Sequence, residues 1–237
     1  MKIILSIILL TIMTCSSGCF KAVSQNSTVN SETTKQVSSD AILLPVPKLT
    51  GSVSIEETMF KRRSVRAYSD EPLSVEEVSQ LLWAAQGITE SWGGRTAPSA
   101  GGLYPLEVYL AVNNVNDLDV GVYKYRPQGH ELVQVKNIDV RAELAAAALD
   151  QEWVKEGAVV IVIAAVYERT TQKYGDRGIQ YVHIEVGHAA QNIYLQATVL
   201  NLGAVTVGAF YDDQVKSVLR MTDNEAPLYV IPVGRKR

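Results

Sequence analysis

Hydrophobic and polar residues alternate with period two in several stretches of the chain. Residues 106–112 (LEVYLAV) show this alternation once, and residues 121–135 show it twice around a Pro-Gln-Gly turn. The alternation predicts a strand in the first stretch and a hairpin in the second. Residues 158–166 (AVVIVIAAV) are apolar throughout and predict a central strand that is buried on both faces. Two further strands are expected over 204–210 and 227–237.

Helices are marked by their predicted caps. Ser54 with Glu57, and Ser74 with Glu77, have the S-x-x-E spacing of a capping box, which predicts a helix after each serine. Three more helices are expected: an alanine-rich one over 139–154 that begins at Asp139, a long one over 179–203 and a last one over 212–221. The polar residues 167–178 are expected to form a loop.

These strands and helices do not alternate regularly along the chain. Regular alternation is typical of parallel, doubly wound sheets. The observed order instead favours an α+β fold, with a central, mostly antiparallel sheet flanked by helices. Residues 53–237 have the size of one domain.

The N-terminal stretch has the composition of a targeting segment. Lys2, an apolar run after it and small residues before Cys19 are typical of a signal peptide, here residues 1–18. Gly18 before Cys19 favours a lipoprotein cleavage site, so that Cys19 carries the lipid and residues 19–52 tether an exported, membrane-anchored domain. An uncleaved anchor and ordinary secretion are the alternatives.

Cysteine usage and charge exclude several kinds of site. Both cysteines, Cys15 and Cys19, precede the domain. Residues 53–237 therefore have no thiol for a disulfide, a nucleophile or a cysteine-based metal site. The net charge is −3, from 22 basic and 25 acidic residues, and no predicted helix carries a basic stripe, so no nucleic-acid partner is expected.

Cationic residues gather near both ends of the domain. One cluster, Arg62, Arg63 and Arg66 around Ser64, follows the first predicted helix, and the other ends the last strand at residues 235–237. Arginine forks match phosphate oxygens in geometry and charge. Two such clusters favour a phosphate-bearing cofactor, whereas one cluster alone is more often a solvated surface patch.

Other familiar sites have weaker support. Glu185 and His188 have the spacing of one half of a di-iron site, but the second half is absent, so a structural role is expected for them. Ser64 and Ser99 lack the G-x-S-x-G context of a hydrolase nucleophile. The glycine-rich stretch before residue 103 does not match G-x-G-x-x-G and follows no strand, so a Rossmann fingerprint is absent.

Residues 97–102 (APSAGG) hold only small side chains and a proline, just before a buried strand. A turn needs one glycine or one proline, which leaves the other small residues unexplained. Small side chains allow the backbone to approach a flat ligand closely.

Five separated segments of the chain, taken in order, resemble those of a known family. They are RRSVRAYSDEPLS, APSAGGLYPLEVY, KYGDRG, YVHIEVGHAAQNIYLQATVLNLGAVTVGAF and YVIPVGRKR. Together they resemble FMN-dependent nitroreductase-fold enzymes, and more narrowly the SagB-type (thiazoline/oxazoline) dehydrogenase branch, over residues 54–237. The resemblance implies a homodimer with FMN at the interface. It also implies an oxidoreductase that moves hydride through flavin N5 by a ping-pong mechanism, with a small-molecule substrate.

The resemblance also assigns the cofactor-binding residues. Contacts to the FMN phosphate, ribityl chain and pyrimidine edge fall on Arg62, Arg63, Ser64 and Arg66, and a second phosphate cluster falls on Arg235, Lys236 and Arg237. The loop beside the isoalloxazine ring, usually supplied by the partner subunit, is Pro98, Ser99, Ala100, Gly101 and Gly102. The strand end beneath the ring is Thr206, Val207, Gly208 and Ala209, where an amide of Gly208 or Ala209 meets N5. Many nitroreductases have asparagine at the position of Gly102.

Lys173 and Tyr174 match the lysine–tyrosine pair proposed to assist proton removal in azoline oxidases, and are the expected catalytic residues. A purely structural role is the alternative for both. Export conflicts with NAD(P)H as donor, because NAD(P)H is essentially absent outside the cytoplasm, so a reduced quinone or an organic substrate is the alternative donor. A non-catalytic lipoprotein that binds flavin or another ligand is the alternative class of function.

Overall fold

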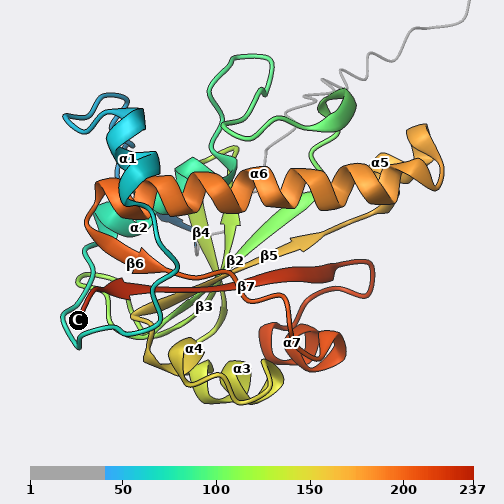
Figure 1. Ribbon diagram of the computed structural model, residues 1–237. Helices are drawn as coiled ribbons and strands as arrows, with labels where there is room; N and C mark the ends of the chain where they lie inside the picture. Colours follow the sequence, from blue (N-terminus) through green and yellow to red (C-terminus); the bar gives the residue numbers. More distant parts are fainter. Residues whose placement is uncertain (1–40) are drawn as a thin grey trace, which may run out of the picture. The chain divides into compact units, whose positions relative to one another are not determined.

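A computed structural model describes residues 41–237 (Figure 1). The expected signal peptide, Cys19 and the first part of the expected tether lie outside these residues. Within the described range, no helix is long and apolar enough to cross a membrane.

Seven strands of the described residues form one sheet, in the order β1-β4-β3-β2-β5-β7-β6. Every neighbouring pair in this sheet is antiparallel, which confirms the predicted α+β class. The strands are β1 (Ala41–Leu43), β2 (Leu106–Val112), β3 (Gly121–Arg126), β4 (Glu131–Lys136), β5 (Val159–Ala165), β6 (Leu202–Ala204) and β7 (Ala226–Arg235). The strand β1 falls within the range expected to be a tether, and it pairs with β4.

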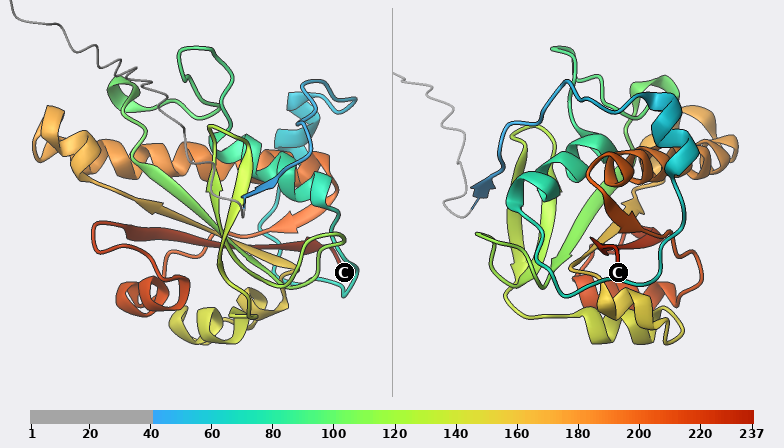
Figure 2. Two further views of the ribbon diagram at one scale, coloured as in Figure 1. Left: turned by 180° about the vertical axis from the view of Figure 1, so that it is seen from behind. Right: turned by 60° about the vertical axis from the view of Figure 1, so that its left-hand side comes forward.

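Helices cover both faces of the sheet (Figures 1 and 2). One face carries α1 (Ile55–Lys61), α2 (Val75–Gln86), α5 (Glu168–Tyr174) and the long α6 (Arg177–Val199). The other face carries α3 (Arg141–Ala147), α4 (Glu152–Glu156) and α7 (Asp212–Leu219). A core lies on each side, and β5 is buried at every position, as its unbroken apolar sequence predicts.

The two predicted helix caps form to different extents. At α2, Ser74 accepts from the Glu77 N–H while the Glu77 side chain accepts from the Ser74 N–H, so the capping box is complete. At α1, Ser54 accepts from the Glu57 N–H at 3.1 Å. The Glu57 side chain is instead paired with Lys61, one turn along the same helix.

Three predicted elements were wrong, each for a local reason. The alanine-rich stretch forms two helices, because Leu149 and Asp150 adopt positive φ values of 58° and 56° between them. The expected loop 167–178 contains α5, which packs on α6 and ends at Gly175 with φ 57°.

The third wrong element is the strand expected over 204–210. The ladder between β6 and β7 stops after Ala204, which pairs with Val233. The next residue of β7 toward its N-terminus is Pro232, which has no N–H to donate. Pairing resumes only as an isolated bridge between Val207 and Val230. The chain therefore leaves the sheet at Gly208.

Candidate functional site

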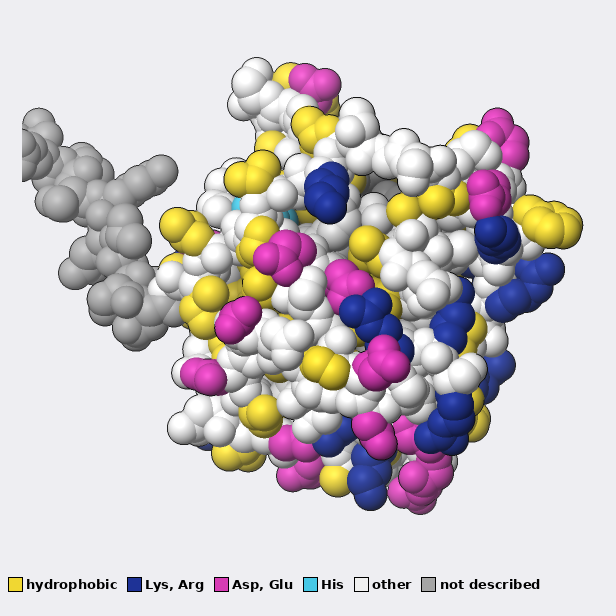
Figure 3. Space-filling view, turned by 90° about the vertical axis from the view of Figure 1, so that its left-hand side faces the viewer, with side chains coloured by type: hydrophobic (Ala, Val, Ile, Leu, Met, Phe, Trp, Pro, Cys, Tyr) yellow, Lys and Arg dark blue, Asp and Glu magenta, His cyan; other side chains and the backbone are white. Residues whose placement is uncertain are grey.

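The cationic segment after α1 and the strand end after β6 lie side by side. Ser64 forms an isolated bridge with Ala204, and the Val65 N–H donates to the Ala204 carbonyl at 2.9 Å. The C-terminus returns to the same place, since Tyr68 bridges Lys236. Lys and Arg side chains gather along one margin of this side of the molecule (Figure 3). Three parts of the predicted FMN site that are distant in sequence thus meet.

Tyr194 of α6 joins two of these parts, and no sequence motif singled it out. Its hydroxyl lies 3.2 Å from Ser64 Oγ and 3.3 Å from Thr206 Oγ1, and accepts the Thr206 N–H at 2.8 Å. The Arg62 guanidinium stacks over its ring, 5.2 Å from the centroid. Burial would raise the pKa of Tyr194, but the hydrogen bonds of Ser64 and Thr206 and the charge of Arg62 outweigh it and lower that pKa.

Two of the three arginines of the first cluster are available to an anion. Within residues 41–237, none of them is ion-paired with a carboxylate. Arg62 and Arg66 rest on aromatic faces, Arg66 at 5.5 Å from the Trp153 ring centroid. Arg63 turns back and donates to the carbonyls of Phe60 and Arg62. Arg62 and Arg66 therefore keep N–H groups for a phosphate or a pyrimidine edge.

The C-terminal cations are placed differently from one another. Arg235 makes a bidentate pair with Glu77 of α2, at 2.7 and 2.9 Å. Lys236 is exposed and reaches Asn201 Oδ1 at 3.3 Å, and Arg237 is exposed. In this geometry a phosphate at the C-terminus meets Lys236 and Arg237 first, while Arg235 fixes the strand end to α2.

The strand end after β6 offers backbone donors. Val207 is buried and its N–H donates to the Val230 carbonyl at 2.8 Å. Gly208 and Ala209 are exposed, and the described part of the chain provides no acceptor for either N–H. Both amides are thus free for an acceptor atom such as flavin N5.

The small-residue loop lies against a different part of α6. Gly101 and Gly102 have φ values of 64° and 66°, which favour glycine. Ser99 Oγ donates to Glu185 Oε2 at 2.6 Å and accepts the Tyr104 N–H at 2.9 Å. The exposed backbone at Pro98, Gly101 and Gly102 leaves one side of the loop open.

Lys173 and Tyr174 are close to this loop. A Cβ atom added to Gly101 would lie 2.6 Å from Tyr174 Oη and 3.0 Å from Lys173 Nζ. Both polar tips therefore converge on the backbone of Gly101. The absence of a side chain at Gly101 is required for this approach, which gives the small-residue loop a physical reason.

The loop and the strand end are separated within one chain. The loop contacts Glu185 and Tyr174, whereas the strand end contacts Tyr194. Tyr194 follows Glu185 by nine positions on the helix, a separation of about 14 Å at 1.5 Å per residue. One chain thus presents two half-sites at different positions along α6.

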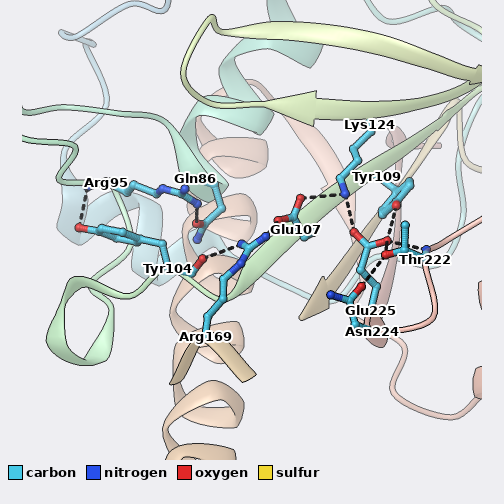
Figure 4. A network of polar contacts seen from close by, with 10 residues as sticks. All are labelled: Gln86, Arg95, Tyr104, Glu107, Tyr109, Lys124, Arg169, Thr222, Asn224 and Glu225. Carbon is cyan, nitrogen blue, oxygen red and sulfur yellow. Dashed lines mark hydrogen bonds and ion pairs between the residues drawn. The ribbon is translucent and has the colours of Figure 1, made fainter. Parts of the chain in front are cut away.

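A polar network holds α5 and the loop to the sheet (Figure 4). Arg169 donates to the Tyr104 carbonyl at 3.1 Å and to Glu107 at 2.5 Å. Glu107 pairs with Lys124 at 3.0 Å, and Lys124 also pairs with the buried Glu225. Sequence patterns did not indicate this network, because its members lie on separate strands and on the stretch expected to be a loop.

The chain therefore presents a set of groups that fits FMN. Within residues 41–237, arginines without a carboxylate partner suit the phosphate and the pyrimidine edge, and amides at Gly208 and Ala209 without an acceptor suit a ring nitrogen. A loop of small residues suits a flat ring. Arg235 is paired with Glu77, so it helps to shape the site but offers no free charge.

Comparisons with known proteins agree with this fit. The family described as "Nitroreductase family" matches residues 59–235. A Methanocaldococcus jannaschii protein named "Putative nitroreductase MJ1384" is 48% identical over 197 residues, which cover 83% of this chain and 98% of that protein. A crystal structure from Ralstonia eutropha, described as a "putative nitroreductase", has a TM-score of 0.74 at 29% identity, over 85% of this chain and 91% of the other.

Two more distant relatives carry more specific names. An FMN reductase (NADPH) of Bacillus subtilis is 23% identical, over 75% of this chain and 64% of that protein. The microcin B17-processing protein McbC of Escherichia coli is 27% identical, over 67% of this chain and 61% of that protein. The chain thus spans less than two thirds of these two relatives. With the family match and the geometry above, the chain belongs to the nitroreductase family and is, in general terms, a flavin-dependent oxidoreductase.

Proposed function

We propose that the chain is an FMN-dependent oxidoreductase of the SagB-type dehydrogenase branch, which moves hydride through flavin N5 by a ping-pong mechanism. The observation that carries this proposal is the convergence of Lys173 and Tyr174 on Gly101 of the flavin-side loop. Similarity to an FMN reductase and to a microcin-processing protein supports it. Its substrate is a small molecule.

Individual residues of the chain have distinct tasks in this proposal. When bound, FMN supplies the hydride chemistry. Arg62 and Arg66 bind and orient the cofactor, and a cation beside the pyrimidine edge favours negative charge there. The free amides of Gly208 and Ala209 orient the ring at N5. Lys173 and Tyr174 hold or accept a proton beside the ring.

A homodimer completes the site in this proposal, because the loop and the strand end are about 14 Å apart along α6. The surface of α6 supports such an interface. Between Gly178 and Val199 its only Asp, Glu, Lys or Arg is the buried Glu185, while Ile179 and Ile184 are more than two-fifths exposed. An uncharged, partly apolar face on a long helix is suited to contact with a second copy. The loop of one subunit would then reach the strand end of the other.

The donor and the location of the protein are part of the same proposal. We propose export and a lipid anchor at Cys19, from the pattern of residues 1–19. An exported enzyme has no supply of NAD(P)H, so an organic substrate or a reduced quinone is the proposed physiological donor.

Anaerobic spectroscopy of the purified protein tests the proposed function. The protein is expected to be yellow and to be bleached by dithionite, which shows that it holds a reducible flavin. NADH and NADPH are expected to bleach it slowly or not at all if an organic donor is used. Rapid bleaching by either nicotinamide would contradict the proposed donor. A flavin that is reduced by dithionite but by no organic donor, quinol or nicotinamide would favour a binding protein instead.

A further inference from the structure

A buried carboxyl group beneath the small-residue loop has no task in the function proposed so far. Glu185 is 3% exposed and lies on α6. Its Oε2 accepts from Ser99 Oγ at 2.6 Å, while its Oε1 is buried and has no hydrogen-bond partner within the described residues. A buried anionic oxygen without a donor is costly. This environment therefore favours the neutral acid.

A short hydrogen bond joins Glu185 to the small-residue loop. Ser99 Oγ accepts the Tyr104 N–H at 2.9 Å and has one hydrogen of its own. That hydrogen points to Glu185 Oε2, which lies 2.6 Å away. Ser99 thus links the Glu185 side chain to the backbone of the loop at Tyr104.

The charged surroundings of Glu185 are sparse. Arg95, in the segment after α2, is the charged group that faces it, and the Arg95 Nε has no partner within residues 41–237. The Arg95 guanidinium donates to Gln86 Oε1 at 2.7 Å and lies 4.6 Å from the Tyr104 ring centroid. Burial raises the pKa of Glu185 to about 7, and the hydrogen bond of Ser99 and the charge of Arg95 only partly offset it.

The titratable groups of α5 contact the same loop. Lys173 and Tyr174 reach Gly101, two residues after Ser99. The loop segment from Ser99 to Gly101 therefore connects Glu185 directly to the expected catalytic pair.

We infer that Glu185 is a positioning residue of this site and that it acts as a neutral acid, which anchors Ser99 and so fixes Gly101 against Lys173 and Tyr174. Its effect on turnover rests on the proposed function, but its protonation does not. Ionisation places a buried anion at Oε1 without a donor. The loop is then expected to shift or admit water, and turnover is expected to fall as the pH rises above about 7.

Variants at Glu185 test the positioning role. Glu185→Gln keeps an acceptor for Ser99 and stays neutral at every pH, so it is expected to retain turnover and to lose the fall above about pH 7. Glu185→Ala is expected to retain FMN but to lower kcat about 10- to 100-fold, because the loop loses its anchor. A wild-type pH profile in Glu185→Gln, or a wild-type kcat in Glu185→Ala, would overturn the inference.

Infrared difference spectra of the whole chain, between about pH 6 and about pH 8, give a readout that needs no flavin. The wild type is expected to lose the carbonyl band of a protonated carboxyl group over this range, and Glu185→Gln is expected to lack that change. Identical difference spectra in the two proteins would overturn the inference. A flavin-free, inactive wild type that still shows the Glu185 band would contradict only the proposed function.

Discussion

The backbone of Gly101 approaches Tyr174 so closely that a Cβ atom on Gly101 would lie 2.6 Å from the Tyr174 hydroxyl. Gly101→Ala should therefore displace Tyr174 and its neighbour Lys173, and strain a backbone with φ 64°. We expect kcat for substrate oxidation to fall about 100-fold while FMN stays bound, since a displacement of about 1 Å can cost that much. Steady-state kinetics of the flavin-loaded variant measure this effect.

Gly102→Ala is the matched control for that variant. Gly102 has nearly the same φ, 66°, but a Cβ atom there meets no atom within 4 Å. The two variants thus share the backbone strain and differ in the clash with Lys173 and Tyr174. An equal loss of kcat in both would show that the loop conformation, rather than contact with the pair, explains the effect.

The double variant Arg62→Ala with Arg66→Ala should lose its cofactor. Both guanidinium groups are held by aromatic rings and are free of carboxylates within the described residues. A hydrogen bond to a charged group contributes about 1.5–3 kcal/mol, so loss of two predicts FMN affinity at least about 100-fold weaker. Fluorescence titration with FMN measures it. Arg126→Ala, which removes an exposed arginine paired only loosely with Glu131 at 3.6 Å, should bind FMN normally.

Tyr194→Phe should weaken FMN binding without removing any charge. The variant loses the hydroxyl that joins Ser64 to Thr206, while the ring under Arg62 remains. Each lost hydrogen bond costs about 1 kcal/mol, which predicts affinity about 10-fold weaker. Unchanged affinity, measured by the same FMN titration, would show that the hydroxyl does not organise the site.

Glu225 should stabilise the fold in a pH-dependent way. Burial would raise its pKa, but bonds from Lys124, Thr222 and Tyr109 outweigh burial and lower it. A lowered folded-state pKa contributes stability above the unfolded value near 4.5, and this contribution is lost as the pH falls through the folded value. Glu225→Gln is therefore expected to reduce the free energy of unfolding by about 2–3 kcal/mol at neutral pH, and by less near pH 4.

Chemical denaturation at several pH values measures this difference. Glu131→Gln is the control, because its pair with Arg126 is partly exposed and should contribute less than about 1 kcal/mol. A pH-independent loss in Glu225→Gln would show that packing, rather than ionisation, explains the effect of the residue.

Sequence patterns predicted strands and helices best where neighbouring residues alone determine the element. The alternation over 106–112 and the apolar run at β5 gave both strands nearly to the residue. The same alternation failed after Ala204, because Pro232 on a strand distant in sequence interrupts the ladder. Similarly, the polar residues of α5 form a helix because they pack on α6, a contact that local pattern does not reveal.

The site could likewise be predicted only where its residues are contiguous in sequence. The arginines, the loop and the strand end could be predicted as parts of a site because each is a contiguous motif. Tyr194 and Arg169 were missed, and so was the pairing of Glu77 with Arg235, since these contacts join residues 12 to 158 positions apart. A long helix such as α6 gives no sequence signal for which of its positions faces a site.

Titration of the flavin-free chain with FMN tests whether the protein forms a flavin site. We predict saturation at about one FMN per chain, a yellow protein and full bleaching by dithionite, with affinity lost in the Arg62 and Arg66 double variant. A folded, colourless protein that takes up no FMN at any concentration would show that the chain is not a flavin-dependent enzyme.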